Sequence, residues 1–314
     1  MSDAPRDLTI DAAGVPIAVR DHGGRGCPIL LVHGLGGNLL AWDLVVPPLL
    51  AHHRVVAVDL RGHGASGDAP WDWDAALDDL DTVIATLGLD RPAVVGHSLG
   101  GMLAGRWARR HPDRVAISLD GHRSQTTDTE HYADIAPDEL HAALTALTAL
   151  FDAQLAGMGS HLTAEQADAL ARRQAEHAAA AGLPPEMMVA QFRRSLAPDG
   201  DGFVTRPSAE LAGGLRTSPE MLDSLPVFAE TVSPLLLVLA TRNLPGQPPE
   251  FDALAAAHRA GLRRDVVPLI AANPLLRVVD ADASHGLVVE RPDLVAELIV
   301  DFVAEQGVRP DAAR

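Results

Sequence analysis

The sequence contains no lysine, and all 25 of its basic residues are arginine. This absence excludes mechanisms that need a lysine amine, among them Schiff-base chemistry, a Walker A phosphate loop and a protein-kinase site. The 42 acidic residues give a formal net charge of −17. So negative a chain is a poor match for nucleic acids or for an anionic membrane surface. The expected partner is therefore a small-molecule substrate, while the composition leaves the oligomeric state open.

Cysteine and long apolar runs are also scarce. Cys27 is the only cysteine, so no intrachain disulfide can form, which fits a cytoplasmic protein. The first residues lack the basic segment and apolar stretch of a secretory signal peptide. The longest candidate apolar run, residues 235–240, is far too short to span a bilayer and is typical of a buried strand. We therefore expect a cytoplasmic protein.

Residues 7–120 alternate between two patterns. Helical patterns at 74–87 and 99–110 separate the later members of a series of short apolar runs. Such runs are typical of strands that are buried on both faces, and their alternation with helices predicts a parallel sheet covered by helices. The expected fold class is therefore α/β, with a mostly parallel, doubly wound sheet. The runs lie at 17–20, 28–32, 55–58, 93–95 and 115–119.

The pattern changes between residues 121 and 232. Strand signals stop there, and Ala-rich helical segments such as 164–181 take over, separated by loop signals at Pro184-Pro185 and at 198–202. Strands resume at 235–239 and 276–279, and a last helix is expected at 293–305. The sequence thus predicts a core formed by 1–120 and 233–314, with an all-helical cap over 121–232 inserted after the sixth strand.

The strongest motif is Gly96-His97-Ser98-Leu99-Gly100, which lies between the apolar run 93–95 and the helical pattern 99–110. Glycines two residues before and two residues after a serine allow a sharp turn from strand to helix, which holds the serine oxygen clear of the backbone. The N-terminus of the following helix also favours developing negative charge. The five-residue pattern occurs by chance elsewhere, but in this setting it predicts Ser98 as a catalytic nucleophile.

A second glycine-rich turn, His33-Gly34-Leu35-Gly36-Gly37, follows the apolar run 28–32. Acyl transfer needs two N–H donors at the point where the carbonyl oxygen becomes negative. The backbone N–H groups of Leu35 and Leu99 are candidates for this oxyanion hole if both loops lie at the same edge of the sheet. The alternative is an ordinary strand-to-helix turn, because glycine-rich turns are common.

His285 is the candidate general base. It lies in Asp282-Ala283-Ser284-His285-Gly286, after the last predicted strand and before the last predicted helix. A histidine that is neutral near pH 7 can accept the proton of a serine. The chain has 14 histidines, so the position after the final strand, rather than the residue type, singles out His285.

Together these motifs resemble those of the α/β-hydrolase superfamily, and the resemblance covers most of the chain outside the inserted segment. It rests on the turn at 33–37, the segment 59–66, the serine turn at 96–100 and the late histidine. The order of serine before histidine agrees with that family. The resemblance implies a serine-nucleophile member of the family with a helical cap after the sixth strand.

The sequence departs from the family at the catalytic acid. Most members carry it after the strand that corresponds to 235–239, where this chain has Asn243. An amide cannot stabilise an imidazolium as a carboxylate does. Some members carry the acid at the end of the sixth strand, and we expect Asp120, which lies there, to replace it. Two alternatives stay open. Asp120 could only cap the following turn, or Ser98 and His285 could act as a dyad that Asn243 supports.

The expected reaction is hydrolysis of a carboxylic ester, a thioester or a lactone of a small or medium, apolar substrate, through an acyl-enzyme on Ser98. Trp42, His122 and Tyr132 are further candidates for the pocket. Two alternatives remain on the same fold, because one fold hosts many chemistries. One is a lyase, an acyltransferase or a cyclase of a biosynthetic pathway, and the other is a catalytically silent ligand-binding protein.

No cofactor and no metal are expected. Residues 62–67 spell G-x-G-x-x-G, but no helix opens directly after them, as a dinucleotide site requires. The His52-His53 pair and the acidic residues at 78–81 lack the spacing of metal ligands.

Overall fold

The computed structural model describes residues 4–180 and 182–307. Its centre is an eight-stranded sheet with the strand order β1-β2-β4-β3-β5-β6-β10-β11. Strands β4, β3, β5, β6, β10 and β11, taken in this spatial order, pair in parallel with their neighbours. Strand β2 is antiparallel to both β1 and β4. The predicted α/β class with a mostly parallel sheet is confirmed. The strands of this sheet are β1 (Arg6–Ala12), β2 (Val15–Gly24), β3 (Pro28–Val32), β4 (Arg54–Val58), β5 (Ala93–His97), β6 (Val115–Leu119), β10 (Leu235–Ala240) and β11 (Leu276–Ala281).

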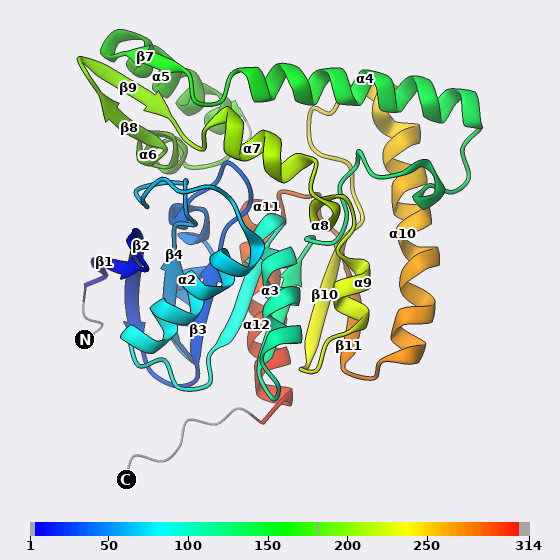
Figure 1. Cartoon of the computed structure of the whole chain (residues 1–314), viewed down its shortest axis with the longest axis horizontal. Helices are drawn as coiled ribbons and strands as arrows, with labels where there is room; N and C mark the ends of the chain where they lie inside the picture. Colours follow the sequence, from blue (N-terminus) through cyan, green and yellow to red (C-terminus); the bar gives the residue numbers. More distant parts are fainter. Residues whose placement is uncertain (1–3, 181, 308–314) are drawn as a thin grey trace.

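Helices cover both faces of this sheet (Figure 1). The hydrophobic cluster on one face joins the sheet to α2, α3, α9 and part of α10, and the cluster on the other face joins it to η1, α1, α11 and α12. These helices are η1 (Leu39–Trp42), α1 (Val46–Leu49), α2 (Trp73–Thr86), α3 (Leu99–Arg110), α9 (Leu225–Ala229), α10 (Asp252–Ala272), α11 (Leu287–Glu290) and α12 (Pro292–Glu305). The short helix η3 (Pro249–Phe251) precedes α10 and packs against a third, smaller cluster.

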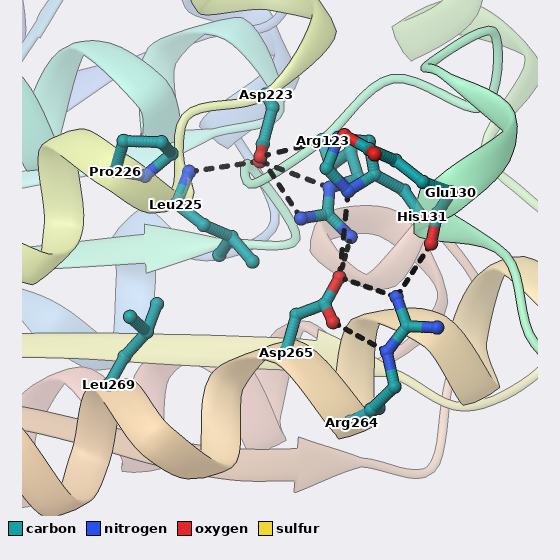
Figure 2. A pocket seen from close by; sticks show the side chains of 9 residues that line it. All are labelled: Arg123, Glu130, His131, Asp223, Leu225, Pro226, Arg264, Asp265 and Leu269. Carbon is teal, nitrogen blue, oxygen red and sulfur yellow. Dashed lines mark hydrogen bonds and ion pairs between the residues drawn. The ribbon is translucent and has the colours of Figure 1, made fainter.

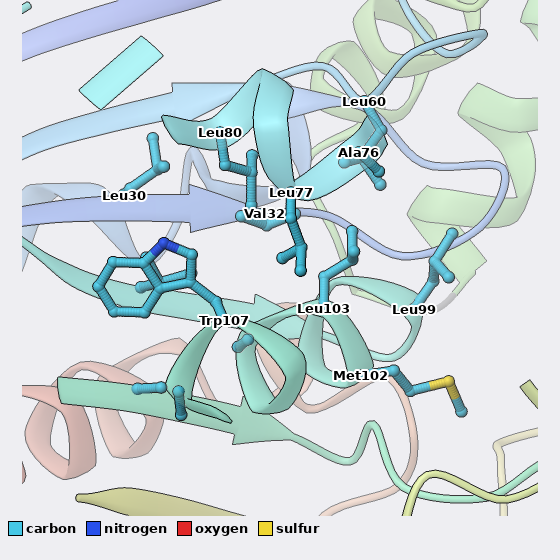
Figure 3. Packing of buried hydrophobic residues seen from close by; sticks show 14 of the residues in the cluster. Leu30, Val32, Leu60, Ala76, Leu77, Leu80, Leu99, Met102, Leu103 and Trp107 are labelled. Carbon is cyan, nitrogen blue, oxygen red and sulfur yellow. The ribbon is translucent and has the colours of Figure 1, made fainter. Parts of the chain in front are cut away.

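Strand β3 illustrates how the central strands are buried on both sides. Successive side chains of a strand point to opposite faces of the sheet. Leu30 and Val32 therefore belong to one hydrophobic cluster, where Figure 3 shows them beside Leu77 and Trp107 from α2 and α3, while Leu31 belongs to the opposite cluster. Because both faces are buried, the strand reads as a continuous apolar run, and the sequence pattern was sufficient to predict it.

Strand β1, at the edge of the sheet, was not predicted. Its sequence, RDLTIDA, alternates exposed charged residues with partly or fully buried apolar ones. An edge strand with one solvated face gives no continuous apolar run, and this is why the sequence signal was weak.

The chain between β6 and β10 differs from the predicted all-helical insertion, which is wrong in one respect. Besides its helices, this segment holds a three-stranded sheet of order β7-β9-β8. The turn residues at 198–202, expected to form a loop, instead close the hairpin between β8 and β9, with Gly200 at a φ of 58°. Strands of three or four partly exposed residues leave almost no pattern to detect. The elements are η2 (Thr129–His131), α4 (Pro137–Ala156), β7 (His161–Thr163), α5 (Ala164–Ala180), α6 (Pro185–Arg194), β8 (Leu196–Asp199), β9 (Gly202–Thr205), α7 (Ala209–Arg216) and α8 (Pro219–Leu222).

Helix α5 agrees with the predicted helix at 164–181, whose expected last residue, Ala181, lies outside the described residues. The loop signal at Pro184-Pro185 proves to be the start of α6, since proline is well suited to the first turn of a helix.

The inserted segment lies across one end of the central sheet (Figure 1). Two polar contacts identify that end as the one where β3 and β4 finish. Arg194, at the end of α6, donates a hydrogen bond of 2.9 Å to Asp59, which follows β4 and is fully buried. Asn38, which lies between β3 and η1, donates one of 2.8 Å to the carbonyl oxygen of Gln191. The segment therefore covers the carboxyl ends of the strands, where α/β proteins bind their ligands.

Among the described residues, no helix combines the length and the apolar character needed to cross a membrane.

Candidate active site

Ser98 lies at the sharp turn between β5 and α3, with a φ of 53° and a ψ of −118°. This conformation is strained for a residue with a side chain. The two glycines of the motif are needed for space: a Cβ atom on Gly96 would lie 1.9 Å from the carbonyl oxygen of Gly100, and one on Gly100 would lie 2.2 Å from that of Val32. The predicted strand, turn and helix around Ser98 are thus present, and they hold its side chain partly exposed at the end of the sheet.

The structure brings Ser98, His285 and Asp120 together from three separate loops. The Nε2 atom of His285 lies 3.1 Å from the Oγ atom of Ser98. Its Nδ1 atom lies 2.7 Å from Oδ2 of Asp120. An ionised carboxylate can only accept a hydrogen bond, so Nδ1 of His285 carries the proton and Nε2 directs its lone pair at the serine hydroxyl. This is the arrangement that a general base requires.

Asp120 ends β6 with a φ of 50° and is held by the neighbouring strand. Its N–H donates to the carbonyl oxygen of Val238 at 2.9 Å, and its Oδ1 atom accepts a bond of 2.9 Å from the N–H of Ala240. Both contacts come from β10, the strand after which most members of the resembled family carry the acid. Strand β10 thus supports the acid here instead of carrying it.

Burial and charge oppose each other at this pair. Burial raises the pKa of Asp120, but the donors His122 and His285 outweigh it and hold that pKa well below its usual value. Burial lowers the pKa of His285, but the hydrogen bond and the negative charge of Asp120 raise it above its usual value of 6.5. About 43% of the His285 side chain is exposed, against 10% for Asp120. The acid is therefore shielded, while the imidazole is open to a ligand.

The glycine-rich turn after β3 lies directly beside the serine. A Cβ atom on Gly34 would lie 3.0 Å from the Cβ atom of Ser98. The predicted condition for an oxyanion hole, two loops at one edge of the sheet, is met. The N–H of Leu99 is at the first position of α3, where no intrahelical acceptor exists. The N–H of Leu35 has no acceptor among the described residues. Both donors are thus free to bind an oxygen.

The side chain of Asn243 is engaged away from His285. Its amide nitrogen donates to Asp252 at 2.6 Å, and its amide oxygen accepts a bond of 2.7 Å from Arg259. A residue that supports the base would contact the Nδ1 atom of His285, and this atom already forms a hydrogen bond with Asp120. The structure therefore does not bring Asn243 into the group formed by Ser98, His285 and Asp120.

The three remaining predicted residues lie in different environments. Trp42 is fully buried in the hydrophobic cluster beneath η1. Tyr132 is also buried, where its hydroxyl donates to the carbonyl oxygen of Gln125 and its ring lies 5.6 Å from that of His258. His122 contacts the site directly, because its Nε2 atom lies 3.1 Å from Oδ1 of Asp120.

His97 was quoted in the serine motif but given no role by the sequence analysis. Its Nε2 atom lies 2.7 Å from the carbonyl oxygen of His285, so the residue before the nucleophile holds the loop of the base. Burial lowers the pKa of His97 to about 4, which keeps its ring neutral. Only its position next to Ser98 could have indicated this contact.

A surface cavity of about 400 Å³ lies outside this group (Figure 2). Its charged walls are paired with one another: Arg123 binds Asp223 at 3.0 Å and Asp265 at 2.7 Å, and Arg264 binds Asp265 at 2.7 Å. None of Ser98, His285 and Asp120 lines it. Both arginines of the cavity are therefore already paired with carboxylates and are not free to bind an anionic ligand.

Within residues 4–180 and 182–307, one group of side chains has the spacing of metal ligands. Potential ligand atoms of Asp128, Glu130 and His131 lie within 4.8 Å of one another, and the two acidic residues are exposed. Exposed acidic groups of this kind are common without an ion, so the spacing alone does not identify a metal site.

Comparison with known proteins agrees with the fold. A sequence model of the α/β-hydrolase fold matches residues 28–133. The chain is 38% identical over 112 residues to 2-hydroxymuconate semialdehyde hydrolase of Pseudomonas sp. (strain CF600), which covers 34% of this chain and 39% of that protein. It is 39% identical over 100 residues to fluoroacetate dehalogenase of Burkholderia sp, covering 30% and 33%. The chain thus matches less than two thirds of the length of these relatives.

Among solved structures, E-2-(acetamidomethylene)succinate hydrolase is similar with a TM-score of 0.67 and 23% sequence identity. That similarity covers 96% of this chain and 100% of the other. At this level of identity the likeness shows the fold, and it extends beyond the matched residues 28–133 to nearly the whole chain.

Proposed function

Because this chain belongs to the α/β-hydrolase superfamily, we propose that it is a serine hydrolase that cleaves a carboxylic ester, a thioester or a lactone. The observation that carries the proposal is the continuous set of contacts from Ser98 through His285 to Asp120, with distances of 3.1 Å and 2.7 Å. This is the order of contacts that a nucleophile, a general base and an orienting acid require.

The reaction proceeds through an acyl-enzyme. The Nε2 atom of His285 takes the proton of Ser98 while the serine oxygen attacks the substrate carbonyl. The negative oxygen that develops is stabilised by the N–H groups of Leu35 and Leu99. His285 then gives its proton to the leaving group. In the second half, a water molecule attacks the acyl-serine with His285 again as base, which releases the acid and restores Ser98.

Asp120 supports both halves of this reaction. It keeps the proton of His285 on Nδ1 and stabilises the imidazolium that forms in each transition state. Residues 121–232 act as a cap in this proposal, because their contacts with Asp59 and Asn38 place them over the carboxyl ends of the strands. A covered site favours a small or medium, apolar substrate over a polymer.

The activities named for the relatives differ among themselves, so the substrate class rests on the residues of this chain. The relative named as a dehalogenase is 39% identical over a short stretch. The haloalkane dehalogenases and epoxide hydrolases of this superfamily use an aspartate nucleophile, whereas this chain has Ser98. Cys27, the single cysteine of the sequence, is buried, and burial raises its pKa to about 11, so the proposal includes no reactive thiol. Because one cysteine allows no intrachain disulfide, the proposal places the protein in the cytoplasm.

The test is mass spectrometry of the intact protein after treatment with a fluorophosphonate, a reagent that labels activated serines. We expect one adduct on the unmodified chain, mapped to Ser98 by peptide analysis, and none on Ser98→Ala. Ser284→Ala, which removes the serine next to the base, is the matched control and should still be labelled. Absence of any adduct on the folded, unmodified protein would overturn the proposal in favour of a lyase or a ligand-binding protein.

A further inference from the structure

Asp120 has a second imidazole partner. The Nε2 atom of His122 lies 3.1 Å from Oδ1 of Asp120, on the oxygen that His285 does not contact. With the N–H of Ala240, the carboxylate accepts three hydrogen bonds, two on Oδ1 and one on Oδ2. Only 8% of the His122 side chain and 10% of the Asp120 side chain are exposed. Water therefore cannot readily replace the His122 contact.

The fold holds His122 from both ends of the inserted segment. Its carbonyl oxygen accepts a bond of 2.8 Å from the N–H of Ser224, where the chain returns from the insertion. The next residue, Arg123, forms an isolated β-bridge with Asp223, and its guanidinium binds the carboxylate of the same residue. His122 is thus fixed by contacts between the segment that enters the insertion and the segment that leaves it.

A third element packs against the ring of His122. The ring of His258, from α10, lies 5.9 Å away at an interplanar angle of 33°. Within residues 4–180 and 182–307, the Nδ1 atom of His122 is buried without a hydrogen-bond partner. The contact with Asp120 is therefore the one polar interaction that the described residues offer to this ring, and it requires a proton on Nε2.

We infer that His122 is a positioning residue, which holds Asp120 by its Oδ1 atom so that Oδ2 faces His285. This inference rests on the proposed hydrolase function. A carboxylate held on one oxygen only by the Ala240 N–H could rotate away from the base, whereas one held by two donors cannot. His122 does not touch the reacting atoms. It acts on Ser98 only through Asp120 and His285.

The hydrogen bond has a second consequence for the base. The pKa of His285 is raised by the hydrogen bond and the negative charge that Asp120 presents to it through Oδ2. Loss of the His122 donor, which lets Asp120 rotate away from the base, should therefore lower the pKa of His285. The charged and titratable groups around this pair are His285 itself, His97 beside the ring of His285, His258 and Arg123 beside His122, and Arg259 within range of Asp120. These stay unchanged when only His122 is replaced.

Three variants separate the hydrogen bond from simple packing. His122→Phe keeps a planar ring without a donor. His122→Gln carries an amide nitrogen that can reach the position of Nε2 and so keeps the donor. His258→Phe is the matched control, because it alters the packing behind His122 but leaves the bond to Asp120 intact. Should His122→Phe fail to fold, His122→Asn, whose amide is too short to reach Asp120, serves as the variant without a donor.

The first measurement is an NMR titration of the histidine rings, in which the His285 signals are assigned by their loss in His285→Asn. This titration measures the pKa of His285 whether or not the protein hydrolyses an ester. We expect the pKa of His285 to fall by about half a unit to one unit in His122→Phe, and to stay near that of the unmodified protein in His122→Gln and His258→Phe. An unchanged His285 titration in folded His122→Phe would overturn the inference.

The second measurement compares kcat and KM on a p-nitrophenyl ester. Loss of positioning should lower kcat of His122→Phe by roughly tenfold, with KM little changed and most of the loss restored in His122→Gln. Equal losses in the Phe and Gln variants would mean that packing, not the hydrogen bond, matters, and would also overturn the inference. If the unmodified protein neither hydrolyses esters nor reacts with fluorophosphonate, the proposed function fails, while the NMR titration still decides the role of His122.

Discussion

Asp120 and His285 lie 165 positions apart in the chain, yet Oδ2 of Asp120 is 2.7 Å from Nδ1 of His285. Asp120 ends β6 and His285 follows β11, and these strands are separated in the sheet only by β10. Because parallel strands bring their carboxyl ends to one edge, residues that follow different strands can meet there. The acid thus reaches the base from the opposite side of β10.

This relationship predicts that Asp120, and not Asn243, supports the base. Asp120→Asn should lower kcat by about 10⁴-fold, by analogy with the corresponding replacement in a serine protease, because an amide favours the wrong tautomer of the histidine. Asn243→Ala is the control and should remain within a few-fold of the unmodified protein, since its side chain binds Asp252 and Arg259. Steady-state kinetics on one ester measure both. A larger loss for Asn243→Ala than for Asp120→Asn would reverse the assignment.

The second prediction concerns pH. Only neutral His285 can accept the serine proton, so kcat/KM should fall as the pH drops through the pKa of this residue. Asp120 raises that pKa above 6.5, so the midpoint of the acidic limb should lie above 6.5 in the unmodified protein. Replacement of Asp120 by Asn removes the charge and should move the midpoint to lower pH. The check is a profile of kcat/KM between about pH 5 and 9.

His52→Gln provides the control for that profile, because His52 is exposed on the turn before β4. Its acidic limb should coincide with that of the unmodified protein. A midpoint that moves in the His52 variant but not in the Asp120 variant would show that another group controls the profile.

The third prediction concerns the close packing behind the nucleophile. A Cβ atom on Gly100 would lie 2.2 Å from the carbonyl oxygen of Val32, and the backbone of β3 cannot move without disturbing the sheet. Gly100→Ala should therefore destabilise the protein by about 3 kcal/mol or more, measured by urea unfolding. Gly214→Ala is the control: this glycine lies in α7 with no atom within 4 Å of an added Cβ. It should be neutral or stabilise the protein by about 0.5–1 kcal/mol.

The fourth prediction concerns the attachment of the inserted segment. Arg194 is the cation bound to fully buried Asp59, whose carboxylate also accepts the N–H groups of Leu39 and Ala65. Arg194→Met leaves that carboxylate buried without its countercharge and should cost about 3 kcal/mol in the free energy of unfolding. Arg193→Met, at the next position, removes an ion pair with Asp168 in which both side chains are 53% exposed. Its cost should stay within about 1 kcal/mol, and equal costs for the two variants would contradict the role of Arg194.

Much of the fold was readable from the sequence because the central strands are buried on both faces. Continuous apolar runs predicted β3 to β6 and β10, and the serine turn was recognisable because its glycines are required locally by close backbone contacts. Strand β11, at the other edge of the sheet, was predicted from the segment 276–279, although that segment contains the exposed Arg277. The edge strand β1 and the small sheet β7-β9-β8 were missed. Their residues are partly exposed, so neither leaves a continuous apolar run.

By itself, the sequence determined the local elements: the strand, sharp turn and helix around Ser98, the glycine turn after β3, and a histidine after the last strand. These depend on residues that are close in the chain and on the backbone freedom of glycine. Only the tertiary structure decided which of two side chains, Asp120 or Asn243, faces His285, because both follow strands that end at the same edge. The choice depends on side-chain direction and hydrogen-bond partners, and these are set by contacts between β6, β10 and α10 that no local pattern records.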